Sequence, residues 1–106
     1  MKDTILVEQA LAGDHQAFNS LIKRYYTDIY RMILSWTKNP EDAKDLTQDV
    51  FISAYQKLSS LKKPQYFRFW LQQIARHRCQ NWQRNKQVDF IPLNNDLISK
   101  EPLIDE

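Results

Sequence analysis

Residues 64–87 have the sequence PQYFRFWLQQIARHRCQNWQRNKQ, and this stretch decides how the rest of the chain is interpreted. It contains no acidic residue. It combines cations with aromatic rings, namely Arg68, Arg76, Arg78, Arg84 and Lys86 with Tyr66, Phe67, Phe69, Trp70 and Trp82. Because cations attract phosphates and aromatic rings stack on unpaired bases, the composition favours binding of single-stranded nucleic acid.

Helical periodicity divides this stretch into two faces. At 100° per residue, an arc of about 100° is expected to face a core, and it holds Phe67, Leu71, Ile74, Ala75 and Trp82. A second arc, about 80° away, mixes one aromatic ring with hydrogen-bonding groups, namely Trp70, Gln73, His77, Asn81 and Arg84. A face meant only for water gains little from a tryptophan. The alternative is that Trp70 borders a wide core stripe and the cations form an ordinary solvated face.

The charges are segregated along the chain, although the net charge of the 106 residues is only +2. Residues 1–50 hold eight acids and six Lys or Arg. Residues 51–88 hold eight Lys or Arg and no acid, and residues 89–106 hold five acids and one lysine. Such a pattern suggests two partner surfaces, one of them polyanionic. The length and the 42% hydrophobic content fit one domain with one small core.

Several classes of protein are disfavoured by composition. With Cys79 as the single cysteine, no intramolecular disulfide or cysteine zinc site is expected, and a reducing, cytoplasmic location is the default. No apolar run approaches about 18 residues, so no membrane span is expected, and the acidic start MKDTILVEQA does not resemble a signal peptide. One glycine, Gly13, disfavours β-hairpins, phosphate loops and dinucleotide folds.

Catalytic and metal-binding patterns are also missing from the sequence. His15 and His77 are too few and too far apart to suggest a metal site, and no nucleophile–base arrangement is visible. Neighbouring cations could lower the pKa of Cys79, but a helical cysteine in a small protein is more often a packing residue. We therefore expect no enzyme activity, no metal and no cofactor.

Helix signals predict an all-α protein. Gly13 ends a short helix over residues 4–11, and Asp14 caps a second helix over residues 15–38. Asn39 and Pro40 start a third helix that reaches about Leu58. We expect a compact bundle of three main helices plus the short N-terminal helix, forming one domain over residues 1–87. Residues 88–106 are expected to be an irregular acidic linker or tail.

The third helix has two unlike faces. Its apolar arc holds Ala43, Leu46, Val50, Phe51, Ala54 and Leu58, and its opposite side holds Asp45, Gln48, Asp49, Ile52 and Gln56. Ile52 is the unusual member of the second set, because it is aliphatic among acids and amides. An apolar centre with a polar rim is typical of a protein interface. The alternative is a single exposed aliphatic residue, which is common.

Three segments in this order resemble region 2 of the extracytoplasmic-function (ECF, group IV) sigma factors of the sigma-70 family. They are LAGDHQAFNSLIKRYYTDIYRMI, NPEDAKDLTQDVFISAYQKL and FRFWLQQIARHRCQNWQR, within about residues 3–87. The shared patterns are G-D-x-x-A-F, A-x-D-L-x-Q-[ED]-x-F and W-L-x-x-I-A-R. The resemblance implies a helical domain that binds core RNA polymerase and promoter DNA.

The resemblance also implies roles for residues. The second segment of the family binds the clamp helices of the β′ subunit, which places Asp45, Gln48 and Asp49 at that interface and agrees with the face that holds Ile52 and Gln56. The family's last helix and preceding loop bind the non-template strand of the −10 element and capture a flipped base. The DNA-binding candidates are Leu61, Lys62, Lys63, Tyr66, Arg68, Trp70, Gln73, Arg76, His77, Gln80, Asn81 and Arg84.

This sequence departs from the family at three positions. Asp49 stands where Glu is common, Gln73 where Arg is frequent, and Pro64 where the loop often has a small residue. The segment after Val88 resembles the start of a linker to a second DNA-binding domain, so the chain is expected to be a region 2 fragment. An anti-sigma factor is a further implied partner. The alternatives are a freestanding helical protein-interaction module and a nonspecific single-strand binder.

Overall fold

A computed structural model describes residues 2–90 of the chain, and side chains for residues 2–86. The elements are α1 (Asp3–Leu11), α2 (His15–Thr37), α3 (Pro40–Gln56), two short 3-10 turns, η1 (Leu58–Ser60) and η2 (Pro64–Tyr66), and α4 (Phe67–Phe90). Residues 2–90 contain no strand, which confirms the all-α class and the order of elements.

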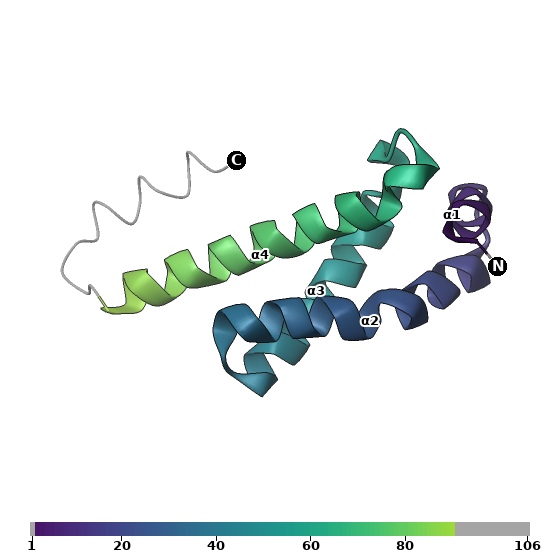
Figure 1. The fold of residues 1–106 in the computed structure, drawn as a ribbon. Helices are drawn as coiled ribbons and strands as arrows, with labels where there is room; N and C mark the ends of the chain where they lie inside the picture. The colour runs from purple at the N-terminus through teal and green to yellow at the C-terminus, as the bar shows by residue number, and fades with distance from the viewer. Residues whose placement is uncertain (1, 91–106) are drawn as a thin grey trace.

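Helix α2 is the central element of the bundle. It contacts α1, α3 and α4, and α3 and α4 also contact each other. In Figure 1, α2 and α4 run in the same general direction, α3 returns between them, and α1 lies beside the start of α2. The buried core comes from all four helices, and its largest fully buried side chains include Phe67, Leu21, Ile29, Ile33 and Leu71.

The predicted helix starts are confirmed. The Asp14 carboxylate accepts hydrogen bonds from the backbone N–H groups of Gln16 and Ala17, and Gly13 adopts a φ of 103° that favours glycine. The Asn39 side chain likewise caps α3, with Pro40 in the first turn. These local bonds fix where each helix begins, and therefore which side chains of each helix face the core.

Three helix ends differ from the prediction. Helix α2 ends at Thr37, because Lys38 turns into a left-handed conformation with a φ of 57°. Helix α3 ends at Gln56, and Leu58 is buried from the following 3-10 turn instead. Helix α4 continues to Phe90, so Val88–Phe90 are helical rather than part of an irregular tail. The rest of the expected tail, residues 91–106, lies outside the described residues.

The last helix begins after Pro64, which interrupts the chain before it. Residues 64–66, the first three of the stretch rich in cations and aromatic rings, form the separate turn η2, and α4 begins at Phe67. Lys63, before Pro64, has the extended geometry that a following proline favours. The loop before α4 is therefore a defined sequence of turns that presents Lys62, Lys63 and Tyr66 at the surface.

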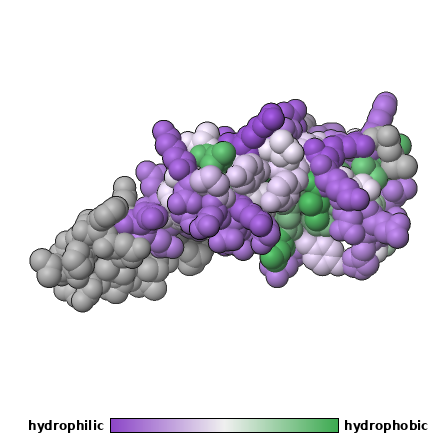
Figure 2. Space-filling model, turned by 90° about the horizontal axis from the view of Figure 1, so that it is seen from below, coloured by the Kyte–Doolittle hydropathy of each residue, from purple (hydrophilic) through white to green (hydrophobic). Residues whose placement is uncertain are grey.

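The face of the molecule drawn in Figure 2 is mostly polar, and on it hydrophobic residues form small separate patches among hydrophilic ones. Among the described residues, the large exposed hydrophobic side chains are Ile5, Leu11, Ile52, Tyr55, Tyr66 and Phe69. Of these six, Ile52 lies on the acidic face predicted for α3, and Tyr66 and Phe69 lie at the start of the basic-aromatic stretch. Half of the large exposed hydrophobic side chains among the described residues thus lie where partner surfaces were expected.

Candidate functional site

The first candidate surface is the outer face of α3. Its five predicted residues, Asp45, Gln48, Asp49, Ile52 and Gln56, are all exposed, and 56% of Ile52 is accessible. On the other side of the helix, Ala43, Val50 and Ala54 are fully buried. Periodicity therefore predicted which side of α3 faces solvent. What this face binds stays a prediction.

A polar residue inside the bundle supports this helix. Thr47 is fully buried, and its hydroxyl donates a hydrogen bond of 2.6 Å to the carbonyl oxygen of Ala43, one turn earlier. Such a bond satisfies a polar group that would otherwise be costly to bury. It allows α3 to pack closely on the bundle without a large side chain at this position.

The second candidate surface begins with an apolar groove beside the loop that precedes α4. The groove has a volume of about 740 Å³ and is lined by Ser60, Leu61, Lys62, Lys63, Tyr66, Phe69, Trp70 and Gln73. Tyr66 and Phe69 are more than half exposed. The aromatic side chains form a surface on which an unstacked base can lie. Lys62 and Lys63 line the same groove and can interact with the phosphates of that nucleotide.

Leu61 is placed differently from the other loop candidates. Only 7% of it is exposed, and it belongs to the hydrophobic core. Lys62, Lys63 and Tyr66 are exposed, as a surface role requires. Leu61 therefore contributes to the floor of the groove and anchors the loop, and it does not project toward solvent. The resemblance to a loop motif could not distinguish these two functions.

A polar groove of about 530 Å³ continues from the apolar one. It is lined by Ser53, Lys57, Trp70, Gln73, Ile74, Arg76, His77, Arg78, Gln80 and Asn81. Trp70 and Gln73 line both grooves, so the two share a wall. The structure thus brings together six of the predicted DNA-binding residues of α4 along one groove: Trp70, Gln73, Arg76, His77, Gln80 and Asn81.

Two predicted residues of α4 lie apart from these grooves. Arg68 is exposed but lines neither of them. Arg84 is half-buried, and its guanidinium donates a hydrogen bond to the side-chain oxygen of Asn81. Arg84 therefore holds the Asn81 amide at the end of the polar groove. A wheel drawn for one helix placed it on the same face but could not reveal this contact.

Sequence reasoning missed two groove residues altogether. Ser53 lies in the last turn of α3 and Lys57 directly follows that helix, and both line the polar groove together with α4. Arg78 was noted as a cation but was not assigned to the site, and its guanidinium donates a hydrogen bond to Ser53. No sequence signal connects positions 53 and 57 with positions 70–81, because the pairing depends on how α3 packs against α4.

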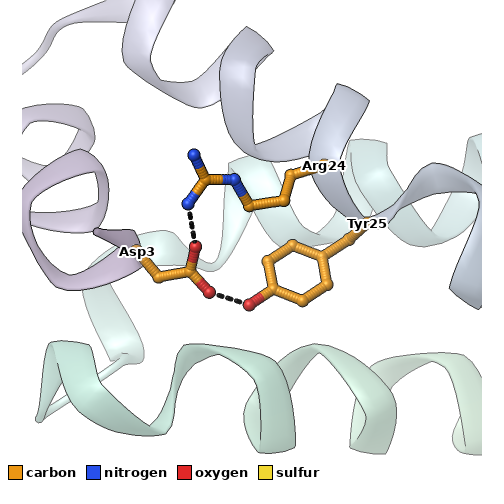
Figure 3. A network of polar contacts seen from close by, with 3 residues as sticks. All are labelled: Asp3, Arg24 and Tyr25. Atoms are coloured by element: carbon orange, nitrogen blue, oxygen red, sulfur yellow. Dashed lines mark hydrogen bonds and ion pairs between the residues drawn. The ribbon is translucent and has the colours of Figure 1, made fainter. Parts of the chain in front are cut away.

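A chain of contacts reaches the groove from the N-terminal helix. The Asp3 carboxylate accepts hydrogen bonds from Arg24 and from the Tyr25 hydroxyl, as Figure 3 shows. The Tyr25 ring lies 5.7 Å from the Phe67 ring, centre to centre, and Phe67 lies 5.7 Å from Trp70. Helix α1 thereby supports the tryptophan that separates the two grooves.

Cys79 is resolved as a packing residue. Its side chain is fully buried, and burial raises the pKa of the thiol to about 11. Desolvation by burial, and not the neighbouring Arg76 and Arg78, sets the direction of this shift in the pKa. At neutral pH the group is a thiol, which is a poor nucleophile and a poor metal ligand.

Within residues 2–90, no group of three or more His, Cys, Asp or Glu side chains is arranged to hold a metal ion. Likewise, none of the helices that the structure describes has the length and apolar character needed to cross a membrane.

Comparison with known proteins identifies the family. A profile of sigma-70 region 2 matches residues 21–88, which is well over half of the chain. The chain therefore belongs to the sigma-70 region 2 family. The ECF resemblance is confirmed by relatives that include the ECF RNA polymerase sigma-E factors of Escherichia coli, 33% identical over 82 residues, and of Haemophilus influenzae, 32% identical over 101 residues.

Coverage of these relatives is partial. The alignment with the E. coli protein covers 77% of this chain and 42% of that protein. The alignment with the H. influenzae protein covers 95% of this chain and 52% of that protein. The RNA polymerase sigma-H factor of Pseudomonas aeruginosa is 32% identical over 80 residues, with 76% and 42% covered. The chain thus spans about half the length of the curated relatives it matches.

A solved structure has the same fold. It is the NMR structure of an engineered region 2 of sigmaE in complex with GTAAAA. The TM-score is 0.77 at 30% sequence identity, and the match covers 84% of this chain and 93% of that one. In that structure, the engineered region 2 is bound to GTAAAA.

Proposed function

We propose that this chain acts as region 2 of an ECF-type sigma factor. In this proposal the outer face of α3 binds the β′ clamp helices of core RNA polymerase. The loop and α4 bind the non-template strand of the −10 promoter element and hold it melted. The chain acts by binding and not by catalysis, in the cytoplasm, and an anti-sigma factor that masks the same surfaces is a further expected partner.

The apolar groove beside the loop is the observation that carries the proposal. Melting a duplex requires a protein that binds unstacked bases better than stacked ones. The exposed rings of Tyr66 and Phe69, with Trp70 between the two grooves, offer stacking surfaces that a duplex cannot use. Lys62 and Lys63 supply positive charge at the same groove. Family membership supports the same assignment.

Charge separation supports two partners instead of one. Asp45 and Asp49 give the α3 face a negative character, which repels phosphates. The grooves beside α4 carry cations, among them Lys57, Arg76 and Arg78. A nonspecific single-strand binder needs only the second surface, and a freestanding protein-interaction module needs only the first.

The first test separates the two surfaces. The double variant D45R/D49R should lose binding to core polymerase in a pull-down or anisotropy titration, while its affinity for single-stranded DNA is retained or increased. The matched control is K23E/R31E on α2, which reverses two exposed charges elsewhere. Core binding that survives in D45R/D49R contradicts the α3 assignment.

The second test concerns base recognition. GTAAAA serves as the starting single-stranded probe, because the related region 2 was solved with it, and the competitor is a scrambled strand of the same composition. Phe69→Ala and His77→Ala alter exposed side chains, so the fold should persist. Loss of a stacking contact should cost about 1–3 kcal/mol on the probe and less on the scrambled strand. Equal losses on both strands favour the nonspecific binder.

A further inference from the structure

The polar groove between α3 and α4 has cations on both walls. Lys57 comes from the end of α3, and Arg76 and Arg78 come from α4. No acidic side chain lines this groove among the residues that the structure describes. Cations that converge from two helices repel one another unless an anion lies between them, so the groove is suited to a negatively charged ligand.

Arg78 is held in place for such a ligand. It is half-buried, and its guanidinium donates a hydrogen bond to the hydroxyl oxygen of Ser53, a residue that is 2% exposed. A guanidinium has five N–H donors in a rigid fork, which leaves donors for a phosphate after the bond to Ser53 is made. Fixing the side chain beforehand lowers the entropy cost of binding.

The position of this groove favours a nucleic-acid strand as the ligand. It shares Trp70 and Gln73 with the apolar groove beside the loop, so one strand can follow both. A base that lies against Tyr66, Phe69 or Trp70 leaves its sugar-phosphate backbone beside that shared wall. The neighbouring phosphates then meet Lys57 and Arg78 across the groove.

We propose that Lys57 and Arg78 bind backbone phosphates of the same DNA strand, one or two nucleotides beyond the base held at the loop, and that Ser53 positions Arg78. This inference rests on the proposed function of the loop and α4, and it adds the end of α3 to the DNA surface. It also assigns a phosphate contact to Lys57, which lines the polar groove on the side opposite Gln73. An acidic segment of a protein partner fits the same charge, but the shared wall with the base-binding groove favours DNA.

The salt dependence of binding provides the first test. Lys57→Gln and Arg78→Gln are compared with the native chain on a strand that contains GTAAAA with flanking nucleotides at both ends. Each lost phosphate contact should reduce the slope of log K against log salt by about 0.7. The matched controls are Lys23→Gln and Arg31→Gln, which remove exposed cations that line neither groove and should leave the slope unchanged.

Neutral linkages in the DNA provide the second test. A methylphosphonate is placed at one position of the strand at a time. One or two positions should weaken binding of the native chain. The position that contacts Arg78 should have no further effect on Arg78→Gln, and the position that contacts Lys57 should have none on Lys57→Gln. Ser53→Ala keeps all charges, so it should keep the salt slope but lower the affinity severalfold, because Arg78 is no longer fixed. Far-UV circular dichroism and thermal unfolding confirm that each variant is folded.

The outcomes separate this inference from the proposed function. If the native chain prefers the GTAAAA strand over its scramble, but Lys57→Gln and Arg78→Gln retain the native slope and the methylphosphonate sensitivity, the inference is overturned and the proposed function stands. If the variants lose core polymerase binding and keep the DNA slope, an acidic protein segment is the ligand and the inference is again overturned. If the native chain shows no strand preference, the proposed function itself fails.

Discussion

The outer face of α3 and the grooves beside α4 differ in how many elements build them. The α3 face is a row of exposed side chains on one helix, from Asp45 to Gln56. The grooves need α3, the loop and α4 together, and their shape depends on the core beneath Trp70. A one-helix surface is set by periodicity alone, whereas an assembled groove is sensitive to packing far from the ligand.

The largest effect that tests this difference is expected from Phe67→Ala. Phe67 is 1% exposed and packs against Tyr25 and Trp70. Its removal should lower the free energy of unfolding by about 3–5 kcal/mol, measured by urea denaturation. After correction for the folded fraction, DNA binding should fall more than core polymerase binding, because only the grooves depend on Trp70. Equal losses would show that the α3 face also depends on this packing.

Phe69→Ala is the matched control for that variant. Phe69 is 61% exposed, so its truncation should change the free energy of unfolding by less than about 0.5 kcal/mol. Its exposed ring is expected to stack on the DNA and not to stabilise the fold, so only the affinity for single-stranded DNA should decrease.

The second effect concerns the buried side of α4. Burial raises the pKa of Cys79 from 9.0 to about 11. Below pH 9 the folded and unfolded chains both hold the proton, and the contribution to stability is fully present. Between pH 9 and 11 the unfolded chain loses its proton first, so the free energy of unfolding should fall by up to about 3 kcal/mol. Urea denaturation across this range measures the decrease.

Cys79→Ala gives the comparison for the pH experiment. The variant should be less stable near neutral pH, because a buried sulfur is removed, but the part of the alkaline decrease that belongs to the thiol should disappear. A native chain and variant with the same pH slope would contradict a buried, protonated Cys79. Rapid alkylation of the native thiol at neutral pH would contradict it as well.

The third effect concerns the start of α3. The Asn39 side-chain oxygen accepts hydrogen bonds of 3.0 and 3.1 Å from the backbone N–H groups of Glu41 and Asp42. Asn39→Ala should lower the free energy of unfolding by about 1 kcal/mol, as measured by thermal unfolding. Asn19→Ala, at an exposed position within α2, is the control and should change it much less. A loss in Asn39→Ala no larger than in Asn19→Ala would show that the cap contributes little.

The smallest effect on stability is expected from Ile52→Ser. Ile52 is 56% exposed, so the free energy of unfolding should change by less than about 0.5 kcal/mol. Core polymerase affinity should nevertheless fall by at least 1 kcal/mol, because apolar residues at the centre of an interface carry much of the binding energy. Unchanged core binding would support the alternative that Ile52 is an ordinary exposed aliphatic residue.

Much of the fold followed from local rules. The caps at Asp14 and Asn39 and the stop at Gly13 were predicted because they depend on side chains within a few residues. The ends that differed have other causes. Lys38 takes a left-handed conformation that no glycine marks, and α4 extends to Phe90 although no apolar period continues there.

The candidate sites divide in the same way. Periodicity alone separated the exposed row on α3 from its buried side, and it grouped Trp70, Gln73, His77 and Asn81 on one side of α4. It could not show that Leu61 is buried or that Arg84 is bonded to Asn81. The burial of a loop side chain depends on which parts of the core the loop packs against. A helical wheel describes a single helix and does not contain this information.

The sequence by itself determined the helices, the segregation of charge and the family, because these depend on residue types and their spacing along the chain. Only the tertiary structure brought Ser53 and Lys57 to Arg78, and only it joined the two grooves at Trp70. The physical reason is that a groove between helices is set by how α3 and α4 pack against each other, which the residue pattern of either helix alone does not contain.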